Sequence, residues 1–302
     1  MNKYYVPNAT KIYKEQERLL KVDKVGDWKA LEDHHRAFKL KVNPRIRKIG
    51  KILDKEIWLI DGVKIRGLIR GTKSYPSVDV DFTSGGHGCR YIYSPLNEIW
   101  IDDGLKRDDI LPTIWHEFTE RHLMQRGWSY NEAHERSASV ELGIRHGDEF
   151  SLPVTNFKQQ TNYSCGAVAM RIVLEYLGRD LTERELIKMV GATPENGTDM
   201  KDMVALAKSE HFDFKVKWKQ RWTPEQVKKF LETGFPMIVN FQHSSKFGEG
   251  HYAVIIGYTK DEFIFSDPSG KGDFRKEKIN HFMKRWHELE DKTKQEGIVI
   301  YW

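Results

Sequence analysis

The pattern of apolar and polar residues predicts both helices and strands in the first hundred residues. Apolar side chains recur at about helical spacing through residues 9–39, which indicates helical structure there. Gly26-Asp27 is expected to interrupt this segment, and Asn43-Pro44 to end it. Short strand-like runs follow, separated by turn-forming residues. They predict a small sheet with strands over residues 56–60, 63–69, 78–82, 90–93 and 98–101, and turns at residues 61–62 and 84–86.

Two helices are predicted after this sheet. The first begins near residues 108–109 and ends at Gly127, and the second covers about residues 129–144. The stretch 148–154, which contains Pro153, comes next, and the pattern of elements restarts beyond it. We therefore expect a domain boundary in this stretch.

The second half of the chain combines helices and strands in another set of elements. Residues 165–177 are apolar on almost every side, which is typical of a buried helix. Thr182 with Glu185 forms a capping-box pattern, and Thr223 with Pro224 starts a further helix. The predicted helices cover residues 165–177, 183–190, 199–210 and 224–234. The predicted strands cover residues 237–241, 251–258, 262–266 and 298–302.

These elements define an α+β fold class with two tandem domains, residues 1–150 and residues 151–302. The length of 302 residues fits two domains of about 150 residues each. Hydrophobic residues make up 39% of the chain and aromatic residues 12%, so a disordered chain is excluded. No apolar run approaches the ~20 residues that a membrane-spanning helix needs, so a membrane protein is excluded as well.

Cysteine content and the first residues favour a cytoplasmic protein. Two cysteines, Cys89 and Cys165, are too few for a disulfide framework in a chain of this length. The first twenty residues have no apolar segment behind a basic one, so no secretory signal is expected.

Positive charge is concentrated near the N-terminus. The formal net charge is +5, whereas residues 1–51 contain 14 Lys/Arg and 6 Asp/Glu, a local balance of +8. Acidic residues are interleaved with the basic ones, which is typical of the solvated face of a helix. No nucleic-acid motif accompanies the charge, so a nucleic-acid partner is not expected.

Cys165 is the first candidate for chemistry. It begins the predicted buried helix and is followed by Gly166. Its thiol is therefore expected near unsatisfied backbone N–H groups and the positive end of the helix dipole, and both favour the nucleophilic thiolate. A cysteine nucleophile also needs a base within hydrogen-bond reach and a third group that orients the base.

His251 and Asp267 can supply that base and that orienting group. His251 opens one predicted strand and Asp267 closes the next, and the short connection over residues 259–261 favours an antiparallel hairpin. In such a hairpin residue 251 pairs near residue 269, within about two positions of Asp267. The imidazole and the carboxylate are therefore expected side by side.

Gln159 is the candidate for an oxyanion hole. It lies six residues before Cys165, and its side-chain amide could act with the backbone N–H of Cys165 on the oxyanion of an acyl-transfer intermediate. Gln160 is an adjacent alternative for the same role.

The order Gln, Cys, His, Asp is that of papain-like enzymes. The segments NYSCGAVAMRIVLEYLG, GTDMKDMVALA, HYAVIIGY and SDPSG resemble the bacteriocin-processing, papain-like cysteine peptidases, over about residues 153–302. The resemblance implies a papain-like peptidase domain. In that domain Cys165 is the nucleophile, His251 the general base, Asp267 the orienting residue and Gln159 the oxyanion donor.

Residues 116–122 of the first half suggest a metal site. On a helix His116 and Glu120 lie at i and i+4, about 6 Å apart on one face. This is the ligand spacing of HExxH zinc proteases, and zinc accepts carboxylate oxygen as well as imidazole nitrogen. Glu117 would be placed to take a proton from metal-bound water. The following helix offers His134 as a third ligand.

Glu141 lies two turns beyond His134 and could be a fourth ligand or a group that orients a ligand. The context resembles zincin-like metallopeptidase domains over about residues 76–145, with the strand NEIWID before the helix much as an edge strand lines the substrate cleft in that family. The resemblance implies zinc as the cofactor. Glu120 stands in place of the second His of the family pattern, and His122 is offset by two residues.

The sequence therefore predicts a thiol hydrolase fused to a zinc-binding domain. It would cleave peptide bonds of a peptide or protein substrate through a Cys-His-Asp triad and a thioester acyl-enzyme, and the first domain would form a second, metallopeptidase centre. Three alternatives remain open. They are an acyltransferase with the same triad, a zincin-like metallopeptidase whose C-terminal domain recruits or processes a peptide, and a non-catalytic binding protein that docks through residues 1–51.

Overall fold

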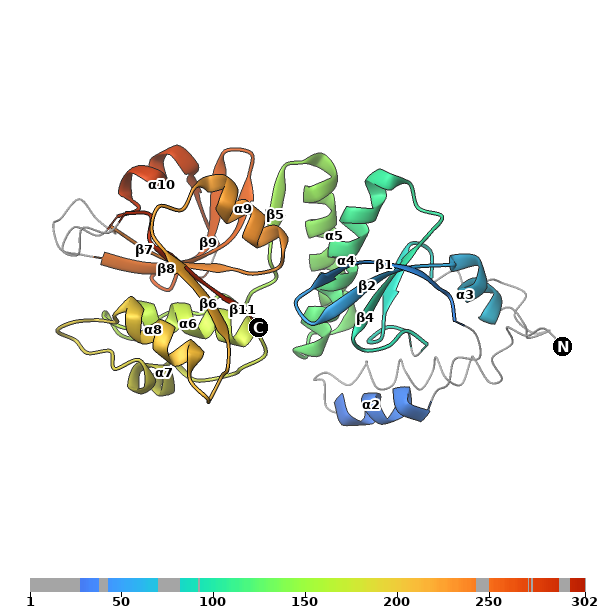
Figure 1. Cartoon of the computed structure of the whole chain (residues 1–302), viewed down its shortest axis with the longest axis horizontal. Helices are drawn as coiled ribbons and strands as arrows, with labels where there is room; N and C mark the ends of the chain where they lie inside the picture. The colour runs from blue at the N-terminus through green and yellow to red at the C-terminus, as the bar shows by residue number, and fades with distance from the viewer. Residues whose placement is uncertain are drawn as a thin grey trace. The chain divides into compact units, whose positions relative to one another are not determined.

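The structure, a computed structural model, describes residues 28–37, 43–69, 82–91, 93–242, 250–270, 272, 274–287 and 294–301. It divides into two compact units that meet in the chain between His146 and Gly147. Each unit has its own sheet and its own helices, so both are mixed α+β (Figure 1). That residues 1–150 and 151–302 are separate folding domains stays a prediction.

The first unit is built on a four-stranded sheet in the order β1-β2-β4-β3. Strands β2 and β4 are parallel, and the other neighbours are antiparallel. The elements are α2 (Trp28–Ala37), β1 (Arg45–Ile52), β2 (Lys55–Ile60), α3 (Gly62–Ile69), β3 (Gly85–His87), β4 (Glu98–Asp102), α4 (Arg107–Gln125) and α5 (Tyr130–His146).

Helix α4 is largely buried between Pro112 and Met124, because it contacts β3 and β4 of the sheet and also packs against α5. A helix covered on several sides has little room for a solvated charged face. Its polar residues His116, Glu117 and Glu120 are therefore drawn into the interior, where charged groups need partners.

Most elements predicted for the first unit are confirmed. Helix α2 lies within the predicted segment 9–39, and β2, β4, α4 and α5 lie where the pattern indicates them. Residues 1–27 and 38–42, with the predicted interruption at Gly26-Asp27, lie outside the described residues.

The strand predicted over residues 63–69 is wrong, because these residues form α3. Asp61 begins this helix: its carboxylate accepts the Lys64 N–H at 2.9 Å, and its carbonyl accepts the Ile65 N–H at 3.2 Å. A local cap thus outweighs the strand preference of the β-branched residues.

The strand predicted over residues 90–93 is also wrong. The N–H groups of Arg90 and Tyr91 both donate to the His87 carbonyl in a turn. The strand in this part of the chain is β3, which begins earlier and contains Gly85 and Gly86, where the sequence pattern predicts a turn. Most of the predicted strand 78–82 lies outside the described residues, and Phe82 is not in a strand.

The expectation that NEIWID forms an edge strand is wrong as well. These residues form β4, which lies between β2 and β3 in the sheet. The edge strand beside α4 is β3, which contacts that helix directly.

The second unit is built on a seven-stranded sheet in the order β10-β9-β8-β7-β11-β6, with β5 paired to β8. Helices α6, α7 and α8 lie on one face, and α9 and α10 on the other (Figure 1). The elements are β5 (Glu149–Ser151), α6 (Cys165–Tyr176), α7 (Glu183–Met189), α8 (Met200–Lys208), β6 (Lys215–Lys219), α9 (Pro224–Glu232), β7 (Met237–Gln242), β8 (Gly250–Thr259), β9 (Glu262–Ser266), β10 (Arg275–Lys278), α10 (Ile279–Arg285) and β11 (Gly297–Tyr301).

The predicted helices of this unit are confirmed. Helix α6 is buried along most of its length, and residues such as Ile172 and Leu174 are fully covered. Each such side chain contributes about 1.5–3 kcal/mol by leaving water. Both predicted caps are present, at Thr182 before α7 and at Thr223 before α9.

The predicted hairpin is confirmed: β8 and β9 are antiparallel, with Val254 opposite Ser266. A bulge follows Ile255, and at Gly257 an added Cβ would lie 2.2 Å from the Phe150 carbonyl oxygen, so glycine allows β5 to pair closely there. The predicted strands β7 and β11 are present too. The pattern did not predict β5, β6, β10 or α10.

Among the residues that the structure describes, no helix combines the length and the apolarity needed to cross a lipid bilayer.

Candidate functional site

Cys165 is the first residue of α6, as predicted. Gly166 follows it, and a Cβ at that position would lie 2.6 Å from the Thr198 Cβ. Glycine therefore allows Thr198, from the GTDM segment, to pack against the start of the helix beside the thiol.

The Cys165 sulfur is surrounded by hydrogen-bond donors. The His251 imidazole and the backbone N–H groups of Gly166 and Tyr252 bond to it. Burial raises the pKa of the thiol, but these bonds and the charge of the imidazolium outweigh burial and hold the pKa below its usual range. The site thus favours the thiolate chiefly through the His251 imidazole, and the Gly166 N–H at the helix start contributes as well.

His251 connects the thiol to a buried carboxylate. Its Nε2 lies 2.7 Å from Asp267 Oδ1, and its imidazole also bonds Cys165. Burial lowers the pKa of His251, but the bonds to Asp267 and Cys165 outweigh burial and raise the pKa to about 9. Burial raises the pKa of Asp267, but the bonds from His251 and Ser269 and the Arg275 charge hold it well below its usual range.

The three side chains thus lie in a row in which an imidazolium between thiol and carboxylate favours the thiolate on one side and the carboxylate on the other. The elements that bring them together are the start of α6, the start of β8 and the end of β9. Side chains 86 residues apart in sequence meet because α6 packs on β8.

Gln159 lies beside this group, and its side chain makes a local bond. Its Nε2 donates to the Thr161 carbonyl at 2.7 Å, and its backbone N–H donates to the Pro268 carbonyl at 2.9 Å. Its Oε1 is buried and accepts no hydrogen bond from the described residues. The oxyanion role of Gln159, and of Gln160 as its alternative, stays a prediction.

Glu183 is a residue of this site that sequence reasoning missed. It is buried, and its carboxylate accepts the Gln160 N–H at 2.9 Å and the Ser164 hydroxyl at 2.6 Å. It thus fixes both ends of the loop between Gln159 and Cys165. The sequence pattern marks only its neighbours Thr182 and Glu185, as a capping box.

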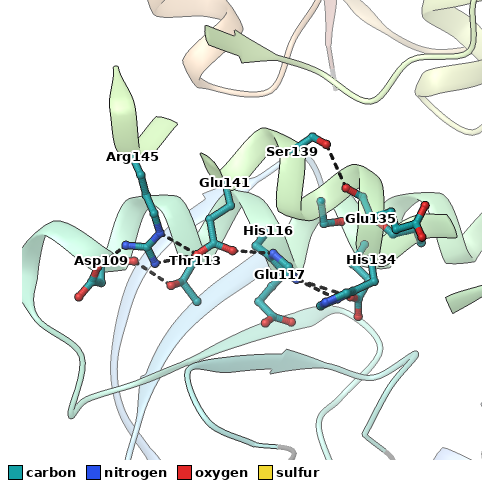
Figure 2. Close-up of polar contacts among 12 residues, drawn as sticks. Asp109, Thr113, His116, Glu117, His134, Glu135, Ser139, Glu141 and Arg145 are labelled. Carbon is teal, nitrogen blue, oxygen red and sulfur yellow. Dashed lines mark hydrogen bonds and ion pairs between the residues drawn. The ribbon is translucent and has the colours of Figure 1, made fainter. Parts of the chain in front are cut away.

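The first unit contains a second group of functional side chains, at the contact between α4 and α5. Figure 2 shows His116 between Glu141 and His134, with Glu117 nearby. His116, Glu120 and His134, the three predicted ligands, come together there and could hold a metal ion. His122 is not a member of this group, although its sequence position is close.

The three ligand atoms lie close enough together to hold one cation, and two of their three separations are near those around zinc. His116 Nε2 lies 3.3 Å from His134 Nδ1 and 3.6 Å from Glu120 Oε2, and His134 Nδ1 lies 2.8 Å from Glu120 Oε2. Ligand atoms around tetrahedral zinc are about 3.3–3.5 Å apart, given Zn–N and Zn–O distances of roughly 2.0–2.2 Å. Two imidazole nitrogens and a carboxylate oxygen also suit zinc chemically.

His116 and Glu120 each have a partner on the atom that faces away from the other candidate ligands. Glu141 Oε2 lies 2.7 Å from His116 Nδ1, so Glu141 bonds the ring nitrogen that faces away from Glu120. His87 on β3 has its Nε2 3.0 Å from Glu120 Oε1, the oxygen that does not face the other two ligands. Such partners fix the ring and carboxylate orientation of metal ligands.

His87 was not predicted, because it lies 29 residues before His116 on a strand that was not recognised. It is fully buried, and with Glu117 and Glu120 it forms a second group with ligand-like geometry. Gly85, also on β3, leaves room for Glu117: an added Cβ would lie 2.8 Å from the Glu117 Cγ.

The pKa shifts in this cluster indicate which of its side chains carry positive or negative charge. Burial lowers the pKa of His116, but Glu120, Glu141 and Glu117 outweigh burial and raise it to about 10. The bond from His116 lowers the pKa of Glu141 to about 2. Burial and the Glu120 charge raise the pKa of Glu117 above its usual range. A proton on His116 thus supplies positive charge among these carboxylates.

The cluster faces a cavity of about 220 Å³. His134 is about half exposed, at 47% of its side chain, so the cavity is reachable from solvent. Tyr130 stacks on His134 with ring centroids 5.4 Å apart, and Arg90 lies over Tyr130 on the cavity wall.

Comparison with known proteins identifies the second unit. Residues 151–294 match the model of the family described as the Peptidase_C39 like family. No curated protein matches the chain. Nothing in these comparisons identifies the first unit as zincin-like.

Several solved structures are similar over half of this chain. One is a double glycine motif protease from an AMS/PCAT transporter in complex with the leader peptide, at 19% identity and a TM-score of 0.39, covering 50% of this chain and 93% of that one. Another is the peptidase domain of Streptococcus ComA, at 17% identity and a TM-score of 0.40, covering 50% of this chain and 97% of that one. A third, described as a C39-like peptidase from Bacillus anthracis, has 14% identity and a TM-score of 0.41, and the match covers 50% of this chain and 97% of that one.

The C-terminal half is therefore a Peptidase_C39-like domain, of the papain-like cysteine peptidases. The resemblance of residues 153–302 to the papain-like, bacteriocin-processing peptidases is thus confirmed as membership of the C-terminal half in this family.

The pKa shifts of Cys165 and His251 predict an unusual pH dependence of thiol alkylation. Cys165 should begin to react with iodoacetamide at a lower pH than an ordinary cysteine, and roughly tenfold faster than Cys89 at neutral pH. Burial raises the pKa of Cys89. The reactivity of Cys165 should change again above about pH 9, where His251 loses its proton.

Mass-spectrometric alkylation profiles between acid and alkaline pH measure this behaviour. His251→Ala should move the onset for Cys165 to higher pH, because it removes the bond and the charge that stabilise the thiolate. His211→Ala, at an exposed site, should leave the profile unchanged. A wild-type profile that coincides with that of His251→Ala would contradict the assignment.

Proposed function

We propose that the C-terminal domain hydrolyses peptide bonds, with Cys165 as nucleophile, His251 as general base and acid, Asp267 as the residue that orients His251, and Gln159 as an oxyanion donor. The observation that carries this proposal is the set of bonds at the Cys165 sulfur. An imidazole and two backbone N–H groups bond one partly exposed thiol at the start of a helix. An inert buried cysteine has an elevated pKa and no such donors.

The proposed reaction has two stages. The Cys165 thiolate attacks the carbonyl carbon of the scissile bond, and the His251 imidazolium gives its proton to the leaving amine, which leaves the acyl group on sulfur as a thioester. His251, now neutral, takes a proton from water as the water oxygen attacks the thioester. The acid product leaves, and the thiolate and imidazolium are restored. Backbone N–H groups and the Gln159 amide would stabilise the negative oxygen in both stages.

A leader peptide that ends in a double-glycine motif is the first substrate to test. The domain is Peptidase_C39-like, and a double glycine motif protease bound to its leader peptide is among the similar structures. The same triad would also serve an acyltransferase, so the products need to be identified: a free acid indicates hydrolysis, and an amide with an added amine indicates transfer.

Incubation of the full chain with a synthetic double-glycine leader joined to a short cargo should give cleavage after the glycine pair. Cys165→Ala and His251→Ala should each lower kcat/KM by roughly a thousandfold or more. Cys89→Ala should have no such effect, since Cys89 belongs to the other unit. Mass spectrometry of the products is the measurement, and cleavage that survives Cys165→Ala would contradict the proposal.

We also propose that the first unit binds one zinc ion through His116, Glu120 and His134. The support is the mutual spacing of the three ligand atoms, with Glu141 and His87 fixing two of the ligands from behind. Zinc would polarise a carbonyl and lower the pKa of water. Glu117 faces the same cavity and would accept a proton from water there, which would make this unit a second, metallopeptidase centre.

Zinc binding should be seen as one ion per chain after dialysis of the full-length protein, measured by elemental analysis. His116→Ala and His134→Ala should each weaken binding at least roughly tenfold, and the exposed His146→Ala should not. Affinity should fall as pH falls, because His116 must lose a proton whose pKa is raised to about 10 before it can bind zinc. Zinc content unchanged in His116→Ala would contradict the site.

A further inference from the structure

The two oxygens of Asp267 have different partners. Oδ1 accepts hydrogen bonds from His251 Nε2 at 2.7 Å and from the backbone N–H and hydroxyl of Ser269 at 3.0 and 2.8 Å. Oδ2 accepts the Nε–H of Arg275 at 3.0 Å. The carboxylate is buried, with 5% of the side chain exposed. Its orientation is thus fixed from both sides, and Arg275 is the partner of the oxygen that faces away from His251.

Arg275 is itself held in place. It lies opposite Phe265 in the β9–β10 pair, and its guanidinium is 4.3 Å from the Phe265 ring centroid and 5.5 Å from that of Phe241. It also bonds Glu277. The stacked guanidinium thus bonds Asp267 through Nε and Glu277 through a second nitrogen, a planar two-sided arrangement that a lysine would not reproduce.

We propose that Arg275 is a positioning residue of the Cys165 centre: its guanidinium holds Asp267 so that Oδ1 faces His251, and its charge limits how strongly Asp267 stabilises the imidazolium. This inference rests on the proposed function of the triad.

The charges around His251 come from four elements. Cys165 faces it from α6, Asp267 from the end of β9, and Arg275 stands behind Asp267 on β10. Glu277 on β10 is bonded by Arg275, Arg285 and His281, the last two from α10. Glu277 thus lies between two arginines. Within this network, Arg275 is the residue that hydrogen-bonds Asp267, so it can act on the imidazole through that carboxylate.

The charge of Arg275 affects the pKa of His251 in a direction that this arrangement determines. A positive guanidinium near the imidazole disfavours the imidazolium, so its removal makes the imidazolium more stable. Arg275→Gln should therefore raise the pKa of His251 by roughly 0.5–1 unit. It should also release Asp267 Oδ2, so the carboxylate can rotate and its bond to the His251 Nε2–H becomes less ordered.

Nuclear magnetic resonance of the full chain measures both effects. The His251 ring signal, assigned by its loss in His251→Ala, is titrated with pH, and the low-field signal of the Nε2–H is compared at fixed pH. Arg275→Gln should shift the titration upward and broaden the Nε2–H signal. Lys276→Gln removes the same charge one residue away, from a side chain that pairs with Glu149, and should change neither.

Arg275→Lys keeps the positive charge but changes the hydrogen-bond geometry, so it separates the two effects. It also replaces Arg275→Gln in the test if that variant does not fold. It should keep the titration close to that of the wild type and still broaden the Nε2–H signal, because the guanidinium fork is lost. An unchanged titration and an unchanged Nε2–H signal in a folded Arg275 variant would overturn the inference.

Cys165 alkylation in the wild type separates this outcome from failure of the proposed function. If Cys165 reacts fast and the Arg275 variants match the wild type, the inference on Arg275 alone is wrong. If wild-type Cys165 reacts no faster than Cys89, the proposed triad is wrong, and the inference falls with it.

Discussion

The hydrogen bond between the Cys165 sulfur and the His251 imidazole is the contact on which the proposed chemistry of the second unit depends. It exists because a buried helix begins at the thiol and packs on the strand that begins at the imidazole. Burial alone would suppress the thiolate, and the imidazolium and two backbone N–H groups reverse that effect. Asp267 and Cys165 raise the pKa of His251 to about 9, and Arg275 and Ser269 both donate hydrogen bonds to Asp267.

The first unit shows the same principle with a different ligand set. Helix α4 is covered by β3, β4 and α5, so its histidine and glutamates are buried together. Their charges require a partner. Hydrogen bonds among these side chains and a raised pKa of His116 meet that need, and the same three side chains could hold a cation. The two units thus place ionisable groups in the interior by the same means, a helix packed on a sheet.

Local patterns were enough to predict the elements that carry the triad and the three metal-ligand candidates. The apolar run after Cys165, the caps at Thr182 and Thr223, and the short turn between β8 and β9 each encode their own structure, and hairpin geometry brought His251 to Asp267. Helical spacing likewise brought His116 to Glu120. What sequence reasoning missed depends on distant contacts. His87 reaches Glu120 from β3, Glu183 reaches Ser164 across 19 residues, and Arg275 reaches Asp267 from a strand that the pattern did not show. The helix α3 was mistaken for a strand because one aspartate cap outweighed several β-branched residues.

The ionisation state of the Cys165 sulfur is the central claim, and ultraviolet absorbance of the thiolate measures it directly. The difference spectrum between the wild type and Cys165→Ser should show one thiolate per chain at neutral pH, and this signal should disappear only on acidification. A difference spectrum without thiolate absorbance until the pH reaches the range of an ordinary cysteine would contradict the account.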